Sequence, residues 1–384
     1  LYYGRFLETL RIPAQLIMIY SDSQSALAIT HDPGVQAEAA GVEAAPLTND
    51  CPRRKMMPRF RPSARVALPL VSAVLLLTPA ALPAFQEPTL SIASGTVTGA
   101  DYAVASAIAK IFNRKRVAYG MRLTSVESEG PLANMDAVVS GKTAFGIAPT
   151  ELLQRAARGA DTWEGRPQDG LRAVLGLHVE AVTVVAAQDR KIDAVRDLQG
   201  KRVNIGAPGS TSHRYAAALL ESAGVSPGDV ILVERPAALA PDLLQAKEID
   251  AYISTVGHPN LSLLEASTGK RKVRLIPLDA ALIEQATTRT PLLFPTTIPA
   301  GFYPAWQGQG AVPTIGVRAV LFTRADMAEE TVYRLVRDIL TEFALFQRQH
   351  PVLQGLTPRE SCGVTAVPYD PGAERYCREA GLAP

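Results

Sequence analysis

The segment KRVNIGAPGSTSHRYAAALLESAGV, residues Lys201 to Val225, decides the fold class. A short apolar strand, Arg202 to Ile205, runs into a loop of small residues from Gly206 to Ser212, and a predicted helix extends to Ala223. The pattern continues with a strand over 230–234, a helix over 239–245 and a strand over 249–254. This order of elements predicts a parallel sheet with right-handed crossovers.

The same unit occurs once before in the chain. A strand from Leu90 to Ala93 enters the loop SGTVTG, residues Ser94 to Gly99, and an amphipathic helix follows. A strand over 121–126, a helix over 132–139 and a strand over 143–148 complete the unit. Two copies of one unit predict an α/β protein with two lobes that face each other.

Two longer apolar segments have the length to cross between the lobes. They are predicted strands over 171–187 and 314–323, and two crossings make a hinge. A helix with a continuous apolar stripe follows the second segment, and Asp326 with Glu329 resembles a capping box at its start. We therefore predict a two-lobe fold with a hinge of crossing strands. Residues 88–180 are predicted to form the first part of lobe 1, and residues 181–298 to form lobe 2. Residues 299–384 hold a crossing strand and C-terminal helices that close on the lobes.

The N-terminal part of the chain predicts targeting rather than a folded domain. Residues 1–55 show no sustained strand or helix period in their apolar residues, so we treat them as an N-terminal extension of doubtful origin. Residues 56–84 have a basic start, an apolar run over 66–77 and small residues up to Ala84, as in a secretory signal peptide. A membrane anchor is the alternative, but Pro69, Pro79 and Pro83 favour cleavage. Export to the periplasm follows from this prediction.

The overall composition excludes several classes of function. The chain has 384 residues with 39 Lys and Arg against 37 Asp and Glu, which gives no broad basic surface for nucleic acid. Three cysteines do not support a disulfide framework or a multi-cysteine zinc module. After loss of Cys51 with the leader, Cys362 and Cys377 remain, either as a disulfide in an oxidising compartment or as two free thiols.

Both glycine-bearing loops are candidates for ligand binding. In parallel α/β sheets, ligands bind beyond the carboxyl ends of strands, where loops lead into helix N-termini. The backbone N–H groups there, with hydroxyls of Ser94, Thr96, Thr98, Ser210, Thr211 and Ser212, are suited to a carboxylate or another small anion. Neither loop has a nucleotide or dinucleotide motif, so we expect no cofactor.

The sequence gives little support to an enzyme. His213 follows Ser210 and Ser212, but adjacent residues at a helix start point apart, and the chain has no G-x-S-x-G elbow. Histidines 178, 213, 258 and 350 are scattered, without H-E-x-x-H or His/Cys ligand spacing, so no metal is predicted.

Several segments, in their order along the chain, resemble one known family. The segments SGTVTGADYAVASAIAKIFN from Ser94, ESEGPLANMDAVVSGKTAFGIAPTE from Glu127, and Lys201 to Val225 are similar to the TAXI-type solute-binding proteins of TRAP (tripartite ATP-independent periplasmic) transporters. IDAYISTVGHPN from Ile249, the segment 298–327 and PGAERYCREAGL from Pro371 extend the resemblance over nearly all of the exported part.

The resemblance implies a type II periplasmic-binding fold and a monomeric receptor without catalytic activity. It also implies a small ligand, glutamate-like or dicarboxylate-like, that is handed to a TRAP-type membrane permease. By matching position, the ligand contacts expected are Thr96, Val97, Thr98, Tyr102, Asn134, Ser210, Thr211, Ser212, Gly257 and Tyr303.

Asp101 departs from the family pattern at the start of the first helix. A carboxylate there would repel an anion, bind an ammonium group, or simply serve the helix N-terminus. The alternatives to the TRAP assignment are a receptor for an ATP-driven importer, and a secreted enzyme on the same scaffold.

Overall fold

The computed structural model describes residues 87–306, 310–364 and 366–382. The predicted N-terminal extension and signal peptide, residues 1–84, lie outside these ranges. Within the described residues, no helix has both the length and the apolar character that a membrane crossing requires.

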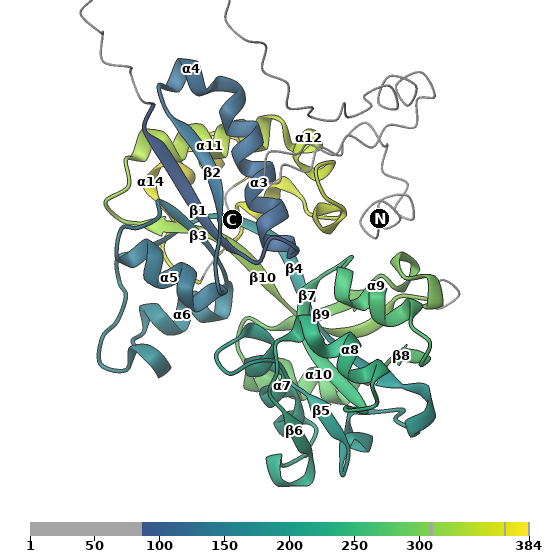
Figure 1. Ribbon diagram of the computed structural model, residues 1–384. Coiled ribbons are helices and arrows are strands. Elements are labelled where there is room, and N and C mark those ends of the chain that lie inside the picture. Colours follow the sequence, from purple (N-terminus) through teal and green to yellow (C-terminus); the bar gives the residue numbers. More distant parts are fainter. Residues whose placement is uncertain (1–86, 307–309, 365, 383–384) are drawn as a thin grey trace, which may run out of the picture. The chain divides into compact units, whose positions relative to one another are not determined.

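Each of the two repeated units forms a small parallel sheet with helices (Figure 1). In lobe 1, β1 pairs in parallel with both β2 and β3, and in lobe 2, β5 pairs in parallel with β6 and β7. The lobe 1 elements are β1 (Thr89–Gly95), α3 (Ala100–Phe112), α4 (Arg116–Tyr119), β2 (Arg122–Glu127), α5 (Pro131–Val139), β3 (Phe145–Pro149) and α6 (Thr150–Ala157). The lobe 2 elements are β5 (Arg202–Asn204), α7 (Thr211–Ser222), β6 (Ile231–Val233), α8 (Ala240–Gln245), β7 (Ala251–Gly257), α9 (Leu261–Thr268), β8 (Val273–Leu275), α10 (Ala280–Arg289) and β9 (Phe294–Ile298). The repeated strand and helix order predicted from the sequence is confirmed.

Two long antiparallel strands, β4 (Leu171–Ala187) and β10 (Val312–Arg324), join the lobes. Strand β10 pairs with β3 at one end and with β9 at the other, while β4 pairs with β7 and β8. The strand order is therefore β2-β1-β3-β10-β4-β7-β5-β6, one path that runs through both lobes (Figure 1). The predicted α/β class with two lobes and crossing strands is confirmed.

The C-terminal helices pack on lobe 1. They are α11 (Glu329–Thr341), α12 (Phe343–Gln347), α13 (Pro358–Ser361) and α14 (Pro371–Glu379). Apolar side chains of α11, such as Leu335, share a buried core with Ile108 of α3 and Leu175 of β4. The predicted capping box is wrong, because α11 begins after Ala328 without a side-chain cap and Asp326 instead pairs with Arg324 at 2.8 Å.

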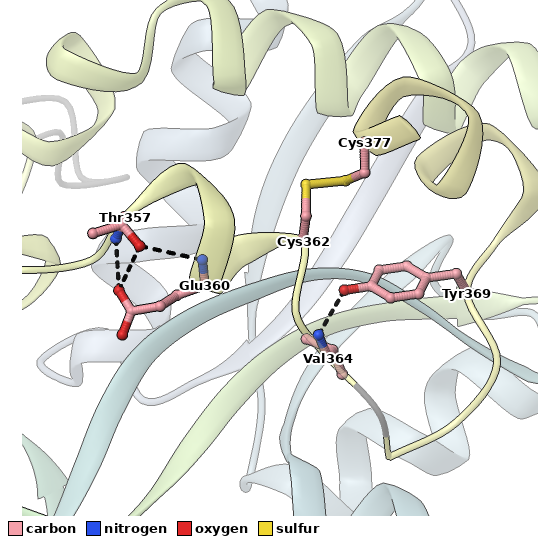
Figure 2. The surroundings of a disulfide bond; sticks show 6 residues. All are labelled: Thr357, Glu360, Cys362, Val364, Tyr369 and Cys377. Carbon is pink, nitrogen blue, oxygen red and sulfur yellow. Dashed lines mark hydrogen bonds between the residues drawn. A yellow bond between two sulfur atoms is a disulfide. The ribbon is translucent and has the colours of Figure 1, made fainter. Parts of the chain in front are cut away.

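Near the C-terminus, a disulfide joins Cys362 to Cys377 of α14, with both residues buried (Figure 2). Of the two alternatives left open by the sequence, the structure contains the bonded pair. Thr357 and Glu360 cap α13 reciprocally, and the Val364 amide donates to the Tyr369 hydroxyl at 2.7 Å. These contacts join parts of the C-terminal segment to one another, and the amide of Asp370 donates to the carbonyl of Ala173 in β4 at 2.8 Å, which attaches the segment to the crossing strand.

Candidate functional site

A cavity of about 350 Å³ lies between the two lobes. Lobe 1 contributes the loop from β1 to α3, and the crossing strand β4 contributes Glu180. Lobe 2 contributes the carboxyl end of β7 and the N-terminus of α9. The lining includes Gly95, Thr96, Thr98, Asp101, Glu180, Tyr252, Ser254, Thr255, Gly257, Asn260 and Glu265. We call this cavity the interlobe cleft.

The start of α3 is the lobe 1 side of the interlobe cleft. Gly99 precedes the helix without a side-chain cap, and Asp101 lies in the first turn. The first N–H groups of an α-helix have no partner within the helix, so this end offers donors and partial positive charge. Across the cleft, the Asn260 side chain caps α9 by accepting from the amide of Leu263.

The interlobe cleft is notable for polar atoms that the described residues leave without hydrogen bonds. These buried atoms include Tyr252 OH, Ser254 Oγ, Thr255 Oγ1, Asp101 Oδ1 and Glu180 Oε2. A buried polar atom without a partner costs about 1–3 kcal/mol, and more for a charged group. Five such atoms belong to residues that line this one cavity, which makes the interlobe cleft a candidate site.

Burial also controls the ionisation of the acidic groups. Burial raises the pKa of Asp101 from its usual 3.8 to about 7, and it holds the pKa of Glu180 well above its ordinary value, with the Asp101 charge as a second cause. Burial lowers the pKa of the neighbouring His178 to about 3, with further contributions from His350 and Arg318. The two carboxyl groups therefore do not both carry full charge at neutral pH.

The structure brings together three of the residues predicted from sequence as ligand contacts. Thr96, Thr98 and Gly257 line the interlobe cleft. Val97 belongs to the same loop and is 55% exposed, and Tyr102 lies partly exposed in the first turn of α3.

Two other predicted residues make hydrogen bonds inside the fold. Asn134 is fully buried, and its amide donates to the carbonyls of Ser94 and Ile147 at 3.0 and 2.7 Å. The Tyr303 hydroxyl lies 2.5 Å from Nδ1 of His258 and accepts from the amide of Asn260. Neither side chain lines the cleft. Asn134 instead joins β1 to β3, and Tyr303 bonds to the residue that caps α9, so both position elements that line the cleft.

The second glycine-bearing loop lines a different cavity of about 410 Å³, also between the lobes. Ser210 lies there and caps α7, which begins at Thr211. The Ser212 hydroxyl accepts from the amide of Thr255 at 3.0 Å, so it ties the loop to the strand beneath it. The two predicted loops thus line separate cavities.

The polar groups of this second cavity satisfy one another. Asp161 of lobe 1 accepts from Arg155 at 2.7 Å and from Arg214 of α7 at 2.9 Å. A cavity of about 560 Å³ beside Arg324 is similar, because Arg324 pairs with Asp326. The interlobe cleft is therefore the candidate site, although it is not the largest cavity.

The sequence did not indicate Glu180 of β4, or Ser254 and Thr255 of β7, as ligand contacts, whereas Tyr252 of β7 was among the aromatic residues expected to wall the ligand. His178 and Glu180 interrupt the apolar run of β4, two residues apart and both buried, and this was the available signal. Ser254 and Thr255 carried no such signal, since small polar residues are common in strands.

The geometry does not assemble a serine nucleophile. Among the described residues, no serine hydroxyl hydrogen-bonds to a histidine ring. Ser210 Oγ accepts from the backbone amide of His213, whose ring instead lies 2.8 Å from Glu234. An activated serine requires its base within hydrogen-bond distance.

The fold and the cleft define a two-lobe α/β protein with a solute-sized cavity at its hinge. The chain belongs to the NMT1-like family, whose model matches residues 92–381.

Several solved structures are similar to this chain at low identity. The aliphatic sulphonate binding protein SsuA from Escherichia coli is 17% identical, with a TM-score of 0.43 over 78% of this chain and 84% of that one. MatC from Rhodopseudomonas palustris with bound malate is 14% identical, with a TM-score of 0.49 over 77% and 97%. A putative L-cystine ABC transporter protein from Listeria monocytogenes is 12% identical, with a TM-score of 0.42 over 71% and 99%.

Proposed function

We propose that this protein is an exported, periplasmic solute receptor that holds a small polar or carboxylate solute in the interlobe cleft. It binds the solute without chemical change and releases it to a membrane permease. Lobe motion about β4 and β10 opens and closes the cleft, because these strands alone join the lobes among the described β-ladders.

The observation that carries the proposal is the set of unpartnered polar atoms in the interlobe cleft. Tyr252, Ser254 and Thr255 line a cavity of about 350 Å³ together with the lobe 1 loop, and their hydroxyls have no hydrogen-bond partner among the described residues. That volume lies within the range of small-molecule sites, and a few placed polar groups in such a cavity orient a ligand. The first turn of α3 adds donors suited to a carboxylate.

The permease we propose is of the TRAP type, and the solute is glutamate-like or dicarboxylate-like. Both proposals rest on the resemblance of the segments described above to TAXI-type receptors. A receptor for an ATP-driven importer is the second candidate, because the same fold and cleft would serve it. Transport into vesicles separates them, since a TRAP permease requires an ion gradient and an importer requires ATP.

Native mass spectrometry tests the receptor function directly. The protein is purified from the periplasm without refolding, and any bound small molecule is released by denaturation and identified. We expect one unmodified organic acid or amino acid per chain. If the recovered molecule is a reaction product of an added solute, the chain is an enzyme and the proposal is wrong.

Variants locate the solute. Ser254→Ala removes one hydroxyl of the interlobe cleft and should weaken binding about fivefold to tenfold, the value of one hydrogen bond. Ser140→Ala, at an exposed position after α5, is the matched control and should bind as the unmodified protein does. Equal affinity in both variants would place the solute elsewhere.

A further inference from the structure

We propose that Asp101, His178 and Glu180 bind one divalent first-row transition metal ion at the wall of the interlobe cleft. The proposal deepens the receptor function, because such an ion would anchor an anionic solute in a cleft lined by two carboxyl groups. It is tested separately from solute binding.

The three side chains converge from two elements. His178 and Glu180 are two residues apart on β4, so their side chains lie on the same face of the strand. Asp101 reaches them from the first turn of α3. Gly257 of β7 permits this approach, because a Cβ at that position would lie 2.8 Å from Cδ2 of His178 and 3.1 Å from Cβ of Ala100.

The distances suit metal coordination. Asp101 Oδ1 lies 3.3 Å from His178 Nε2, and one ligand atom from each of the three residues lies within 4.8 Å of the others. Ligand atoms about 2.1 Å from a tetrahedral or octahedral metal are roughly 3 to 3.4 Å apart. A small side-chain adjustment therefore closes the set around one ion.

Burial and the lack of partners distinguish this cluster from an ordinary ion pair. His178 is 2% exposed and Glu180 is 8% exposed. Within the described part of the chain, neither ring nitrogen of His178 has a hydrogen-bond partner, and neither have Asp101 Oδ1 and Glu180 Oε2. A buried histidine normally satisfies its ring nitrogens, so this ring points to a missing ligand.

The charges also balance. A divalent cation would displace the protons of the two carboxyl groups, and it would neutralise the resulting charge of −2 in a place where an unpaired charge is costly. One imidazole with two carboxylates is a mixed nitrogen and oxygen donor set, which suits Zn²⁺ or Mn²⁺ better than Mg²⁺ or Ca²⁺. Three protein ligands leave coordination positions open for a solute carboxylate, and two of the three, Asp101 and Glu180, line the interlobe cleft.

The experiment measures metal binding without solute. The periplasmic protein is stripped with a chelator and titrated calorimetrically with Zn²⁺, Mn²⁺, Mg²⁺ and Ca²⁺, and bound metal is counted by elemental mass spectrometry. We expect one Zn²⁺ or Mn²⁺ per chain. His178→Gln, Asp101→Asn and Glu180→Gln should each weaken that affinity at least tenfold.

A second histidine and carboxylate pair supplies the matched control. His213 lies 2.8 Å from Glu234 at the surface, where it has no third donor in the metal-ligand groups found among the described residues. His213→Gln should therefore leave metal affinity unchanged. A Co²⁺ titration of the unmodified protein adds a readout independent of variant folding, because nitrogen and oxygen ligation gives visible absorption bands.

The outcomes separate this proposal from the receptor function. Absence of stoichiometric Zn²⁺ and Mn²⁺ binding, or a metal affinity in all three cluster variants that equals that of the unmodified protein, overturns the metal site. If chelated protein binds an ammonium-bearing solute that Glu180→Gln no longer binds, the carboxylates recognise the solute directly and the metal site is wrong while the receptor function stands. Metal binding in a protein that binds no solute would support the metal site and count against the receptor function.

Discussion

Gly257 is a position where one added methyl group should disturb both the packing of β7 and the wall of the interlobe cleft. The residue is buried in β7 and pairs with Glu180 of β4. A Cβ built on it would lie 2.6 Å from Cγ2 of Val352, 2.8 Å from Cδ2 of His178 and 3.1 Å from Cβ of Ala100. Ordinary carbon contacts are about 3.5–4.0 Å, so two of these overlaps approach 1 Å.

None of the three neighbours can move freely. Val352 is β-branched and packs in the lobe 1 core, the His178 ring is buried, and Ala100 is fixed in the first turn of α3. Overpacking of this kind costs about 1–3 kcal/mol. We expect Gly257→Ala to lower the free energy of unfolding by about 2–3 kcal/mol and to weaken ligand binding in the interlobe cleft.

Urea unfolding and calorimetric solute binding measure the two effects. Gly228→Ala is the control, because a Cβ there would meet no atom within 4 Å. Its stability should change by less than about 0.5 kcal/mol, or rise slightly through reduced freedom of the unfolded chain. Equal stability of the two variants would refute the packing argument.

Three further predictions concern stability away from the cleft. Replacing Cys362 and Cys377 by serine opens a loop with a sequence separation of 15 and should cost about 3 kcal/mol, and a reductant should lower the melting temperature of the parent protein but not of this variant. Burial lowers the pKa of His258 from 6.5 to about 3, so stability should fall by up to about 1.4 kcal/mol per pH unit as pH drops from 6.5 toward 3, and His258→Gln should flatten that slope in urea unfolding. Asp250 is 2% exposed and accepts from the backbone amide and guanidinium of Arg202, so Asp250→Asn should destabilise by about 2 kcal/mol, and no loss in thermal unfolding would contradict that role.

The direction in which stability changes with pH at His258 follows from the hydrogen bonds of its ring. Thr183 Oγ1 donates to the carbonyl of Ala181, so it accepts from Nε2 of His258, which leaves Nδ1 to accept from Tyr303. The buried ring is therefore neutral. In the unfolded state the His258 ring binds a proton below about pH 6.5, whereas in the folded state it does so only below about pH 3. Acid therefore favours unfolding.

Local sequence patterns were sufficient to predict the fold. The crossing strand β4 occupies Leu171–Ala187, the same range as the apolar run that predicted it. Repeated strand, loop and helix signals placed both parallel sheets, because such signals depend on neighbouring residues. The capping pattern predicted a side-chain cap by Asp326 at the start of α11. Asp326 pairs with Arg324 instead, and the capping pattern takes no account of that neighbour.

The candidate site was less predictable, because it depends on contacts between distant segments. Position in the loops indicated Thr96 and Thr98, which line the interlobe cleft. Asn134 looked like a ligand contact, but its amide serves two backbone carbonyls of neighbouring strands. The convergence of Asp101 with His178 depends on how α3 lies against β4, and no spacing in the sequence expresses that distance.

The irregular pairing of the crossing strands has a mechanical consequence. The register of β10 against β4 shifts between Arg318 and Val320, opposite Val179 and Gly176. A register shift leaves backbone groups locally unpaired, so bending there breaks fewer hydrogen bonds than bending a regular ladder. His178 lies within this weak point. A ligand or ion bound beside His178 would stiffen the two crossing strands at this point. Binding and the angle between the lobes would then be coupled directly at His178, without a chain of intervening residues.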